Sequence, residues 1–170
     1  MRLSPIRYFW FLILLLPVMG FSGCGPSPDD PITLQSFSVT GTSPSQGGQA
    51  PISPGTNNGQ FSINWVVTGN IYTATVAINS GSVFDPNSNI VLATSCGKRS
   101  QVDNCQSAGT LNCTFNNSDI MQCADGATTY SAQDLTGFLT TVPMNAYMVI
   151  QACNPSGSVC QTSSASVQIQ

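Results

Sequence analysis

Apolar and polar residues alternate along most of this chain, in short runs separated by turn-forming residues. From Phe61 to Val67, the odd-numbered residues are apolar and include Trp65, whereas Ser62 and Asn64 take the other face. A period of two is typical of a half-buried β-strand, and no stretch shows the 3.6-residue period of a helix. We predict strands at Ile32–Thr40, Gln60–Thr68, Tyr72–Asn79, Ile90–Ser95, Ala146–Asn154 and Ser164–Gln170, with a weaker strand within Thr128–Leu135.

Turn signals lie between these runs, in Gly41–Gly59, Asp85–Asn87 and Asn154–Gly157. About seven short strands with such spacing predict an all-β fold, a single antiparallel β-sandwich over residues 32–170. If successive strands alternate in direction, three loops lie at the end where the first strand begins. These loops are Gly69–Ile71, Cys96–Ala127 and Asn154–Val159.

Three segments resemble the fibronectin type III and wider immunoglobulin-like sandwiches: Gln60–Trp65, Tyr72–Ile78 and Pro143–Asn154 with the strand Ser163–Ile169 after it. The resemblance implies that Trp65 is a core residue and that Tyr147 forms a tyrosine corner, its hydroxyl bonded to backbone upstream. Thr141 stands where the family has leucine, and the disulfide-rich excursion Cys96–Cys123 has no counterpart. An unrelated sandwich with the same alternation remains the alternative.

The N-terminus has the features of a secretion signal. Arg2 and Arg7 precede the largely apolar stretch Tyr8–Phe21, which Pro17 interrupts. A transmembrane helix needs ~20 apolar residues, so this run is too short to span a bilayer. A basic start, a short apolar segment and small residues after it predict a removable signal peptide over residues 1–23.

The sequence Phe21-Ser22-Gly23-Cys24 resembles the lipobox of bacterial lipoproteins, with Phe21 where that family usually has leucine. The resemblance implies that Cys24 receives a diacylglycerol and becomes the first residue. The residue after the cysteine is Gly25 rather than aspartate, which in that family is compatible with sorting to the outer membrane. The domain would then lie on the periplasmic or the cell-surface side. Residues 24–31 would then form the acylated cysteine and a proline-rich tether, about 20 Å long at ~3.1 Å per residue. The alternative is an ordinary signal peptide that contains a cysteine.

Six cysteines remain when Cys24 is assigned to lipid, and an even number in an exported chain predicts three disulfides. Six cysteines allow 15 pairings. Because the chain between neighbouring cysteines has the composition of a turn or loop, we expect the pairs Cys96–Cys105, Cys113–Cys123 and Cys153–Cys160. A zinc or iron–sulfur site is disfavoured because the chain has neither a C-x₂-C pair nor a histidine.

The charge composition limits the function. Charged residues make up 6% of the chain, with four basic residues and no histidine. Nucleic-acid binding needs a basic face that this chain cannot build, and histidine-based catalysis is excluded. A hydrolase could use a pair of carboxylates, drawn from Asp103, Asp119 and Asp125 in the cysteine-rich stretch. Aspartate is also a standard turn residue, however, which favours a structural role for these three. Asp85–Asn89 has the alternating oxygens of a calcium loop without its glycine and glutamate, which favours a plain turn.

Lys98 and Arg99 lie side by side between Cys96 and Cys105. A disulfide-closed loop that presents a basic residue could enter the acidic pocket of a trypsin-like protease or grip an acidic glycan. The sequence therefore predicts a lipid-anchored envelope protein without catalytic role, cofactor or metal, which binds a protein or glycan for adhesion or complex docking. The alternatives are a protease inhibitor that uses Lys98 and Arg99 and, less favoured, an aspartate-based hydrolase.

Overall fold

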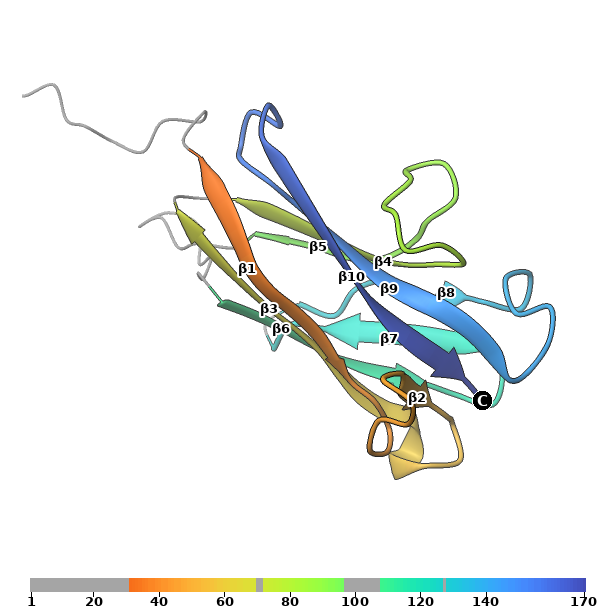
Figure 1. Cartoon of the computed structure of the whole chain (residues 1–170). Helices are drawn as coiled ribbons and strands as arrows, with labels where there is room; N and C mark the ends of the chain where they lie inside the picture. The colour runs from red at the N-terminus through yellow and green to blue at the C-terminus, as the bar shows by residue number, and fades with distance from the viewer. Residues whose placement is uncertain (1–30, 70–71, 97–107, 127) are drawn as a thin grey trace, which may run out of the picture.

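The computed structural model describes residues 31–69, 72–96, 108–126 and 128–170, which form two β-sheets stacked face to face (Figure 1). The elements are β1 (Ile32–Thr40), β2 (Ala50–Ile52), the 3₁₀ turn η1 (Asn57–Gly59), β3 (Gln60–Gly69), β4 (Thr73–Asn79), β5 (Ile90–Cys96), β6 (Ala108–Phe115), β7 (Ile120–Ala124), β8 (Gln133–Asp134), β9 (Met144–Cys153) and β10 (Cys160–Ile169). Among these residues, no helix has the length and apolar character needed to cross a bilayer.

Each sheet contains five strands. The first sheet has the order β1-β3-β6-β7-β8, and the second has the order β2-β10-β9-β4-β5. All pairings are antiparallel except that of β2 with β10, which is parallel. The predicted all-β sandwich is therefore confirmed, although it has ten strands rather than about seven.

The three strands that the sequence analysis did not predict are β2, β6 and β7. Two of them lie in the segment interpreted as a loop excursion between Cys96 and Cys123. Leu111, Cys113 and Phe115 alternate with polar residues in β6, and Met121 and Cys123 do so in β7, so that all five face the core. The excursion is therefore partly a β-hairpin, because its cysteines belong to the apolar side of two paired strands.

The inward-facing side chains of both sheets form one core. It includes the fully buried Ile63, Leu111, Met148 and Ile150, as well as Trp65. The indole Nε1 of Trp65 donates a hydrogen bond of 3.2 Å to the hydroxyl of Tyr72. A buried indole N–H needs such a partner, and the bond joins β3 of one sheet to the residue before β4 of the other. Trp65 is thus a core residue.

Tyr147 lies elsewhere. Ala146 and Met148 point into the core, so the period of two places Tyr147 on the outer face of β9, opposite Asn79 of β4 and Ser166 of β10. Its side chain is half-buried, and its hydroxyl forms no hydrogen bond within the described part of the chain. The expected core position and tyrosine-corner bond of Tyr147 are therefore not observed.

Two disulfides link residues that face each other on neighbouring antiparallel strands. Cys113 of β6 is bonded to Cys123 of β7, and Cys153 of β9 is bonded to Cys160 of β10, each with an S–S distance of 2.04 Å. Both are pairings that the sequence analysis predicted. The third predicted pair lies outside the described residues, except for the backbone of Cys96 at the end of β5.

Gln161 closes one open side of the sandwich. The N–H of Leu34 in β1 donates to Gln161 Oε1 at 2.7 Å, and Gln161 Nε2 donates to the carbonyl of Ile32 at 3.1 Å. The side-chain amide therefore pairs with β1 as a neighbouring strand would. It joins the first strand of one sheet to the last strand of the other.

Replacing Gln161 by leucine is expected to lower the free energy of unfolding by about 2 kcal/mol, because two partly buried backbone groups lose their partners. Urea unfolding of the full-length protein measures this loss. Gln168→Leu is the matched control, since the Gln168 amide contacts the exposed Asn145 side chain, and a change of about 0.5 kcal/mol or less is expected there. Equal losses in the two variants would contradict the bridging role of Gln161.

The pairing register defines two ends of the sandwich. At the proximal end, where β1 begins, Ile32 faces Gly69, Thr73 faces both Cys96 and Cys153, and Gln161 contacts Ile32. The loop after Asn154 lies at this end, as predicted (Figure 1).

The prediction that the whole segment Cys96–Ala127 lies at the proximal end is wrong in part. The turn between β6 and β7 lies at the opposite, distal end, with η1 and the end of β1.

Candidate functional site

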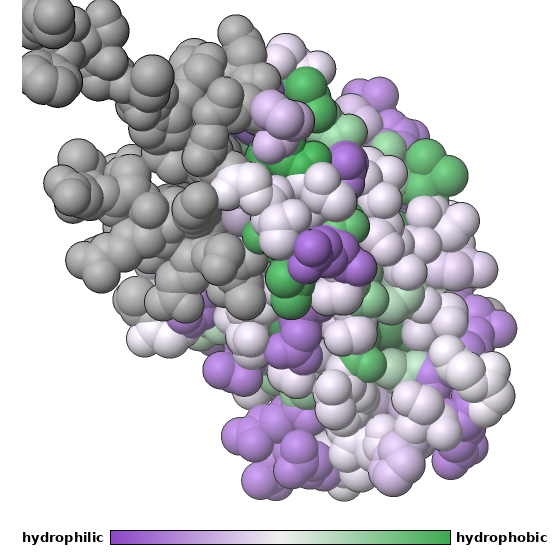
Figure 2. All heavy atoms as spheres, turned by 60° about the vertical axis from the view of Figure 1, so that its left-hand side comes forward, coloured by the Kyte–Doolittle hydropathy of each residue, from purple (hydrophilic) through white to green (hydrophobic). Residues whose placement is uncertain are grey.

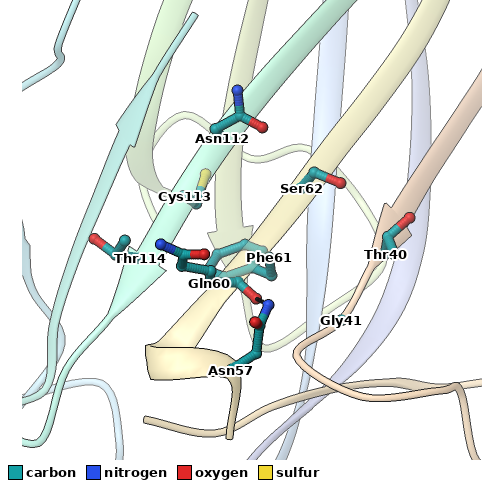
Figure 3. A pocket seen from close by; sticks show the side chains of 9 residues that line it. All are labelled: Thr40, Gly41, Asn57, Gln60, Phe61, Ser62, Asn112, Cys113 and Thr114. Carbon is teal, nitrogen blue, oxygen red and sulfur yellow. Dashed lines mark hydrogen bonds between the residues drawn. The ribbon is translucent and has the colours of Figure 1, made fainter.

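A groove on the outer face of the first sheet is the candidate site. It has a volume of about 440 Å³ and lies at the distal end, where β1, β3, β6 and η1 meet (Figure 3). A volume of this size falls within the ~300–1,000 Å³ of small-ligand sites. The lining residues are Thr40, Gly41, Asn57, Gln60, Phe61, Ser62, Asn112, Cys113 and Thr114.

The strand register brings the polar lining residues together. Thr40 faces Ser62, Ser62 faces Asn112, and Gln60 faces Thr114 across three neighbouring strands. Facing side chains on one side of a sheet lie about 5 Å apart. Phe61 and Cys113 also face each other, but their side chains are buried on the core side of the sheet, so only their backbone borders the groove. The groove therefore carries hydroxyls and amides above the backbone of the sheet.

The sequence Asn57-Asn58-Gly59 positions the rim of the groove. All three residues have positive φ angles of 50°, 52° and 71°, which asparagine and glycine adopt most readily. A Cβ at Gly59 would overlap the carbonyl oxygen of Phe115, so only glycine allows this turn to lie against β6. The turn thus holds Asn57 at the rim, where its Nδ2 donates to the carbonyl of Gln60 at 3.1 Å.

Most polar side chains of the groove have no partner within the described structure. Thr40, Gln60, Asn112 and Thr114 are exposed, and their side chains form no hydrogen bond there. The next row toward the proximal end differs, because Thr110 Oγ1 donates to Asn64 Oδ1 at 3.0 Å and Asn64 Nδ2 donates to Ser62 Oγ at 3.4 Å. The groove therefore contains four side chains whose hydrogen-bonding groups are open to a ligand.

No charged side chain lines the groove. The described part of the chain contains four aspartates, Asp85, Asp119, Asp125 and Asp134, and no lysine or arginine. The outer side of the first sheet comes forward in Figure 2, where the surface is mainly white and purple and green occurs in separate small areas. The groove is therefore a neutral, hydrogen-bonding site on a polar face.

The aspartates considered for catalysis are not brought together. Asp119 precedes β7 and Asp125 follows it, so about six residues of extended chain, ~20 Å, separate them. Asp103 lies outside the described residues, as do Lys98, Arg99 and the lipid attachment residue Cys24. Among the described residues, no group of three or more acidic or cysteine side chains is placed to hold a metal ion.

Asp85 belongs to the turn that the sequence predicts. Its Oδ1 accepts from the backbone N–H of Asn87 at 3.0 Å, and its Oδ2 accepts from Ser88 Oγ at 2.9 Å. Both bonds lower the pKa of the Asp85 carboxyl, and the bond from the Asn87 backbone has the larger effect. Buried Asn79 fixes the rest of this loop through bonds to Val83 and Asn89. The carboxylate is therefore used within its own loop.

Asp125 connects the two sheets at the proximal end. Its carboxylate accepts hydrogen bonds from Tyr130 Oη at 2.7 Å, from the N–H of Thr128 at 2.8 Å and from Ser95 Oγ of β5 at 3.3 Å. Burial raises the pKa of Tyr130, and the hydrogen bond to Asp125 raises it further. This cluster has a structural role, because it ties the edge strand β5 to the chain after β7.

The raised pKa of Tyr130 predicts a loss of stability in alkali. The neutral phenol of Tyr130 is favoured in the folded state. The stability that it contributes is therefore fully present below about pH 10 and is lost as the pH rises above that value. Urea unfolding between about pH 9 and 11 measures the slope. Tyr130→Phe is expected to show a shallower slope than the wild type, and identical slopes would contradict this assignment.

Sequence reasoning did not identify the groove. The candidate residues from the sequence did not include those that line the groove, because their grouping depends on the register of three strands. The residues missed in this way are Thr40, Asn57, Gln60, Asn112 and Thr114. The available signal was the row of uncharged polar residues opposite the core positions of β3.

Comparisons of the chain with models of protein families, with curated proteins and with solved structures find no match.

Proposed function

We propose that this chain is a bacterial outer-membrane lipoprotein without catalytic activity, anchored through Cys24, whose sandwich domain binds a partner in the cell envelope. The observation that carries the proposal is the position of the groove. It lies at the distal end, whereas Ile32, the first residue of β1, lies at the proximal end. A chain anchored a few residues before Ile32 would therefore present the groove away from its own lipid.

The lipid anchor is supported by the basic, apolar and small-residue order of residues 1–24. Acyl chains anchor strongly, because each buried CH₂ contributes ~0.8 kcal/mol. Mass spectrometry of the chain purified from membranes is expected to show a diacylglycerol on the peptide that begins at Cys24. The Cys24→Ser variant is expected to lose this mass and to leave the membrane fraction, and retention of the diacylglycerol would refute the attachment site.

We further propose that the domain belongs to the immunoglobulin-like sandwiches. The order β1-β3-β6 resembles strands A, B and E of that fold, and β10-β9-β4-β5 resembles G, F, C and C′. The strands β7 and β8, which follow β6, are a departure from that pattern. Such sandwiches bind partners through their loops and sheet faces without acid–base chemistry, which agrees with a binding role.

Photo-crosslinking in the native envelope tests the binding role. A photoreactive residue at Thr114, in the groove, is expected to give crosslinked products that mass spectrometry can identify. The same residue at Thr162, an exposed position on the outer face of β10, is the matched control and is expected to give few. Equal crosslinking from both positions, or none from Thr114, would contradict a partner site in the groove.

A further inference from the structure

The free hydrogen-bonding groups of the groove define the chemistry of its ligand. Thr40 and Thr114 have hydroxyls, which donate and accept, and Gln60 and Asn112 have amides, which also do both. None of these side chains is bonded within the described structure. A ligand that satisfies them must offer many donors and acceptors at close spacing, as the hydroxyls of a sugar do.

The absence of charged side chains from the groove limits the chemical class of its ligand further. A phosphate or an acidic glycan needs a cation for tight recognition, and no lysine or arginine occurs among the described residues. A basic peptide would need a carboxylate, and none of the four described aspartates lines the groove. Binding a charged group in a neutral groove costs desolvation without a compensating ion pair. The complementary ligand is therefore neutral.

The shape of the groove favours a chain over a single small molecule. The groove is open toward the outer face of the sheet, and Figure 3 shows its polar side chains along three neighbouring strands, from Thr40 to Thr114. The side chains of Phe61 and Cys113 are buried on the core side of the sheet, so the floor between the polar side chains is strand backbone. A row of hydroxyls and amides along an open groove fits successive sugar units, whose hydroxyls lie at the edges of their rings.

We propose that the groove binds a neutral oligosaccharide. This inference rests on the proposed binding function and specifies its ligand class. Thr40, Gln60, Asn112 and Thr114 would form hydrogen bonds to sugar hydroxyls, and Asn57 would limit the groove at its rim. Few contacts and an open site imply a millimolar affinity for one domain. Many copies anchored on one membrane would raise the effective affinity for a long glycan through multivalency.

NMR titration of the full-length protein in detergent micelles tests the ligand class. The probes are the neutral hexamers of glucose and of N-acetylglucosamine, with the hexamer of galacturonic acid as the anionic counterpart. At least one neutral hexamer is expected to cause saturable shifts of the amides of Thr40, Asn112 and Thr114, and the acidic hexamer is expected to cause none. No saturable shift with either neutral hexamer, or equal shifts with the acidic one, would overturn the proposal.

Variants locate the site. The double variant Asn112→Ala, Thr114→Ala is expected to bind the neutral hexamer at least about fivefold more weakly, the effect of one lost hydrogen bond of ~1 kcal/mol. The control Thr162→Ala, Ser164→Ala alters the outer face of the other sheet and is expected to leave the affinity unchanged. Both sets lie at outward positions, so unchanged melting temperatures verify folding. Equal affinities in the two variants would overturn the assignment.

The two proposals fail in different ways. If Thr114 crosslinks to a protein in the envelope while neither neutral hexamer binds, the oligosaccharide is rejected and the binding role stands. If neither crosslinks nor saccharide binding occur at the groove, both proposals fail.

Discussion

Replacing Cys113 and Cys123 together by alanine is expected to lower the free energy of unfolding by about 3–4 kcal/mol. The two residues are 2% and 1% exposed and lie within the core cluster. Their loss removes the constraint on the unfolded chain, which is worth ~2–3 kcal/mol for a loop of this length. It also leaves a small cavity where the two sulfurs contacted their neighbours.

The second disulfide is the matched control. Cys160 is exposed, and hydrogen bonds of the buried Asn154 to Ser158 and Val159 also fix the loop between Cys153 and Cys160. Replacing this pair by alanine is therefore expected to cost about 2 kcal/mol or less. Guanidinium unfolding of the oxidised full-length proteins measures both losses. A loss for the Cys153/Cys160 variant that equals or exceeds that of the core pair would contradict the assigned burial.

The Gly109→Ala variant is expected to lose about 3 kcal/mol of stability. Gly109 of β6 faces Trp65 of β3, and a Cβ added to Gly109 would overlap the indole ring. The ring must then move within a close-packed core, and the Trp65–Tyr72 hydrogen bond is strained or broken. Glycine is thus required at this position because the indole occupies the space of a side chain.

Gly137→Ala provides the comparison, because no atom lies near the Cβ that it would add. Its stability is expected to change by about 0.5 kcal/mol or less. Guanidinium unfolding gives the two free energies, and the indole N–H resonance of Trp65 reports the hydrogen bond to Tyr72. If Gly109→Ala leaves both the stability and this resonance unchanged, the proposed packing of Trp65 on Gly109 is wrong.

Alternation alone was sufficient to locate the strands with strongly apolar inward faces. The predicted and observed bounds of Ile32–Thr40 agree, and β3 and β5 each extend one residue further than predicted. The hairpin of β6 and β7 has the same alternation, with Leu111, Cys113 and Phe115 facing inward. It was missed because its cysteines and asparagines were interpreted as features of a loop, although two cysteines on the apolar face are themselves evidence for a strand.

Features that depend on distant pairing could not be predicted. The three-residue strand β2 contains Pro51 and exists because it pairs with β10, more than a hundred residues later. The outward position of Tyr147 follows from the phase of β9, which the alternation of Tyr147, Val149 and Gln151 with Met148 and Ile150 left ambiguous because both sets contain apolar residues. The groove likewise requires the register of β1, β3 and β6, which no local pattern encodes.

The central claim is that a lipid on Cys24 holds the domain by its proximal end and leaves the groove facing away from the membrane. Energy transfer to acceptor-labelled lipid headgroups in proteoliposomes tests this claim, with a donor dye attached at either Pro155 or Thr114. Pro155 is an exposed residue of the proximal loop between β9 and β10, and Thr114 lines the groove. Stronger transfer from the dye at Pro155 is predicted, whereas equal transfer, or stronger transfer from the dye at Thr114, would contradict the account.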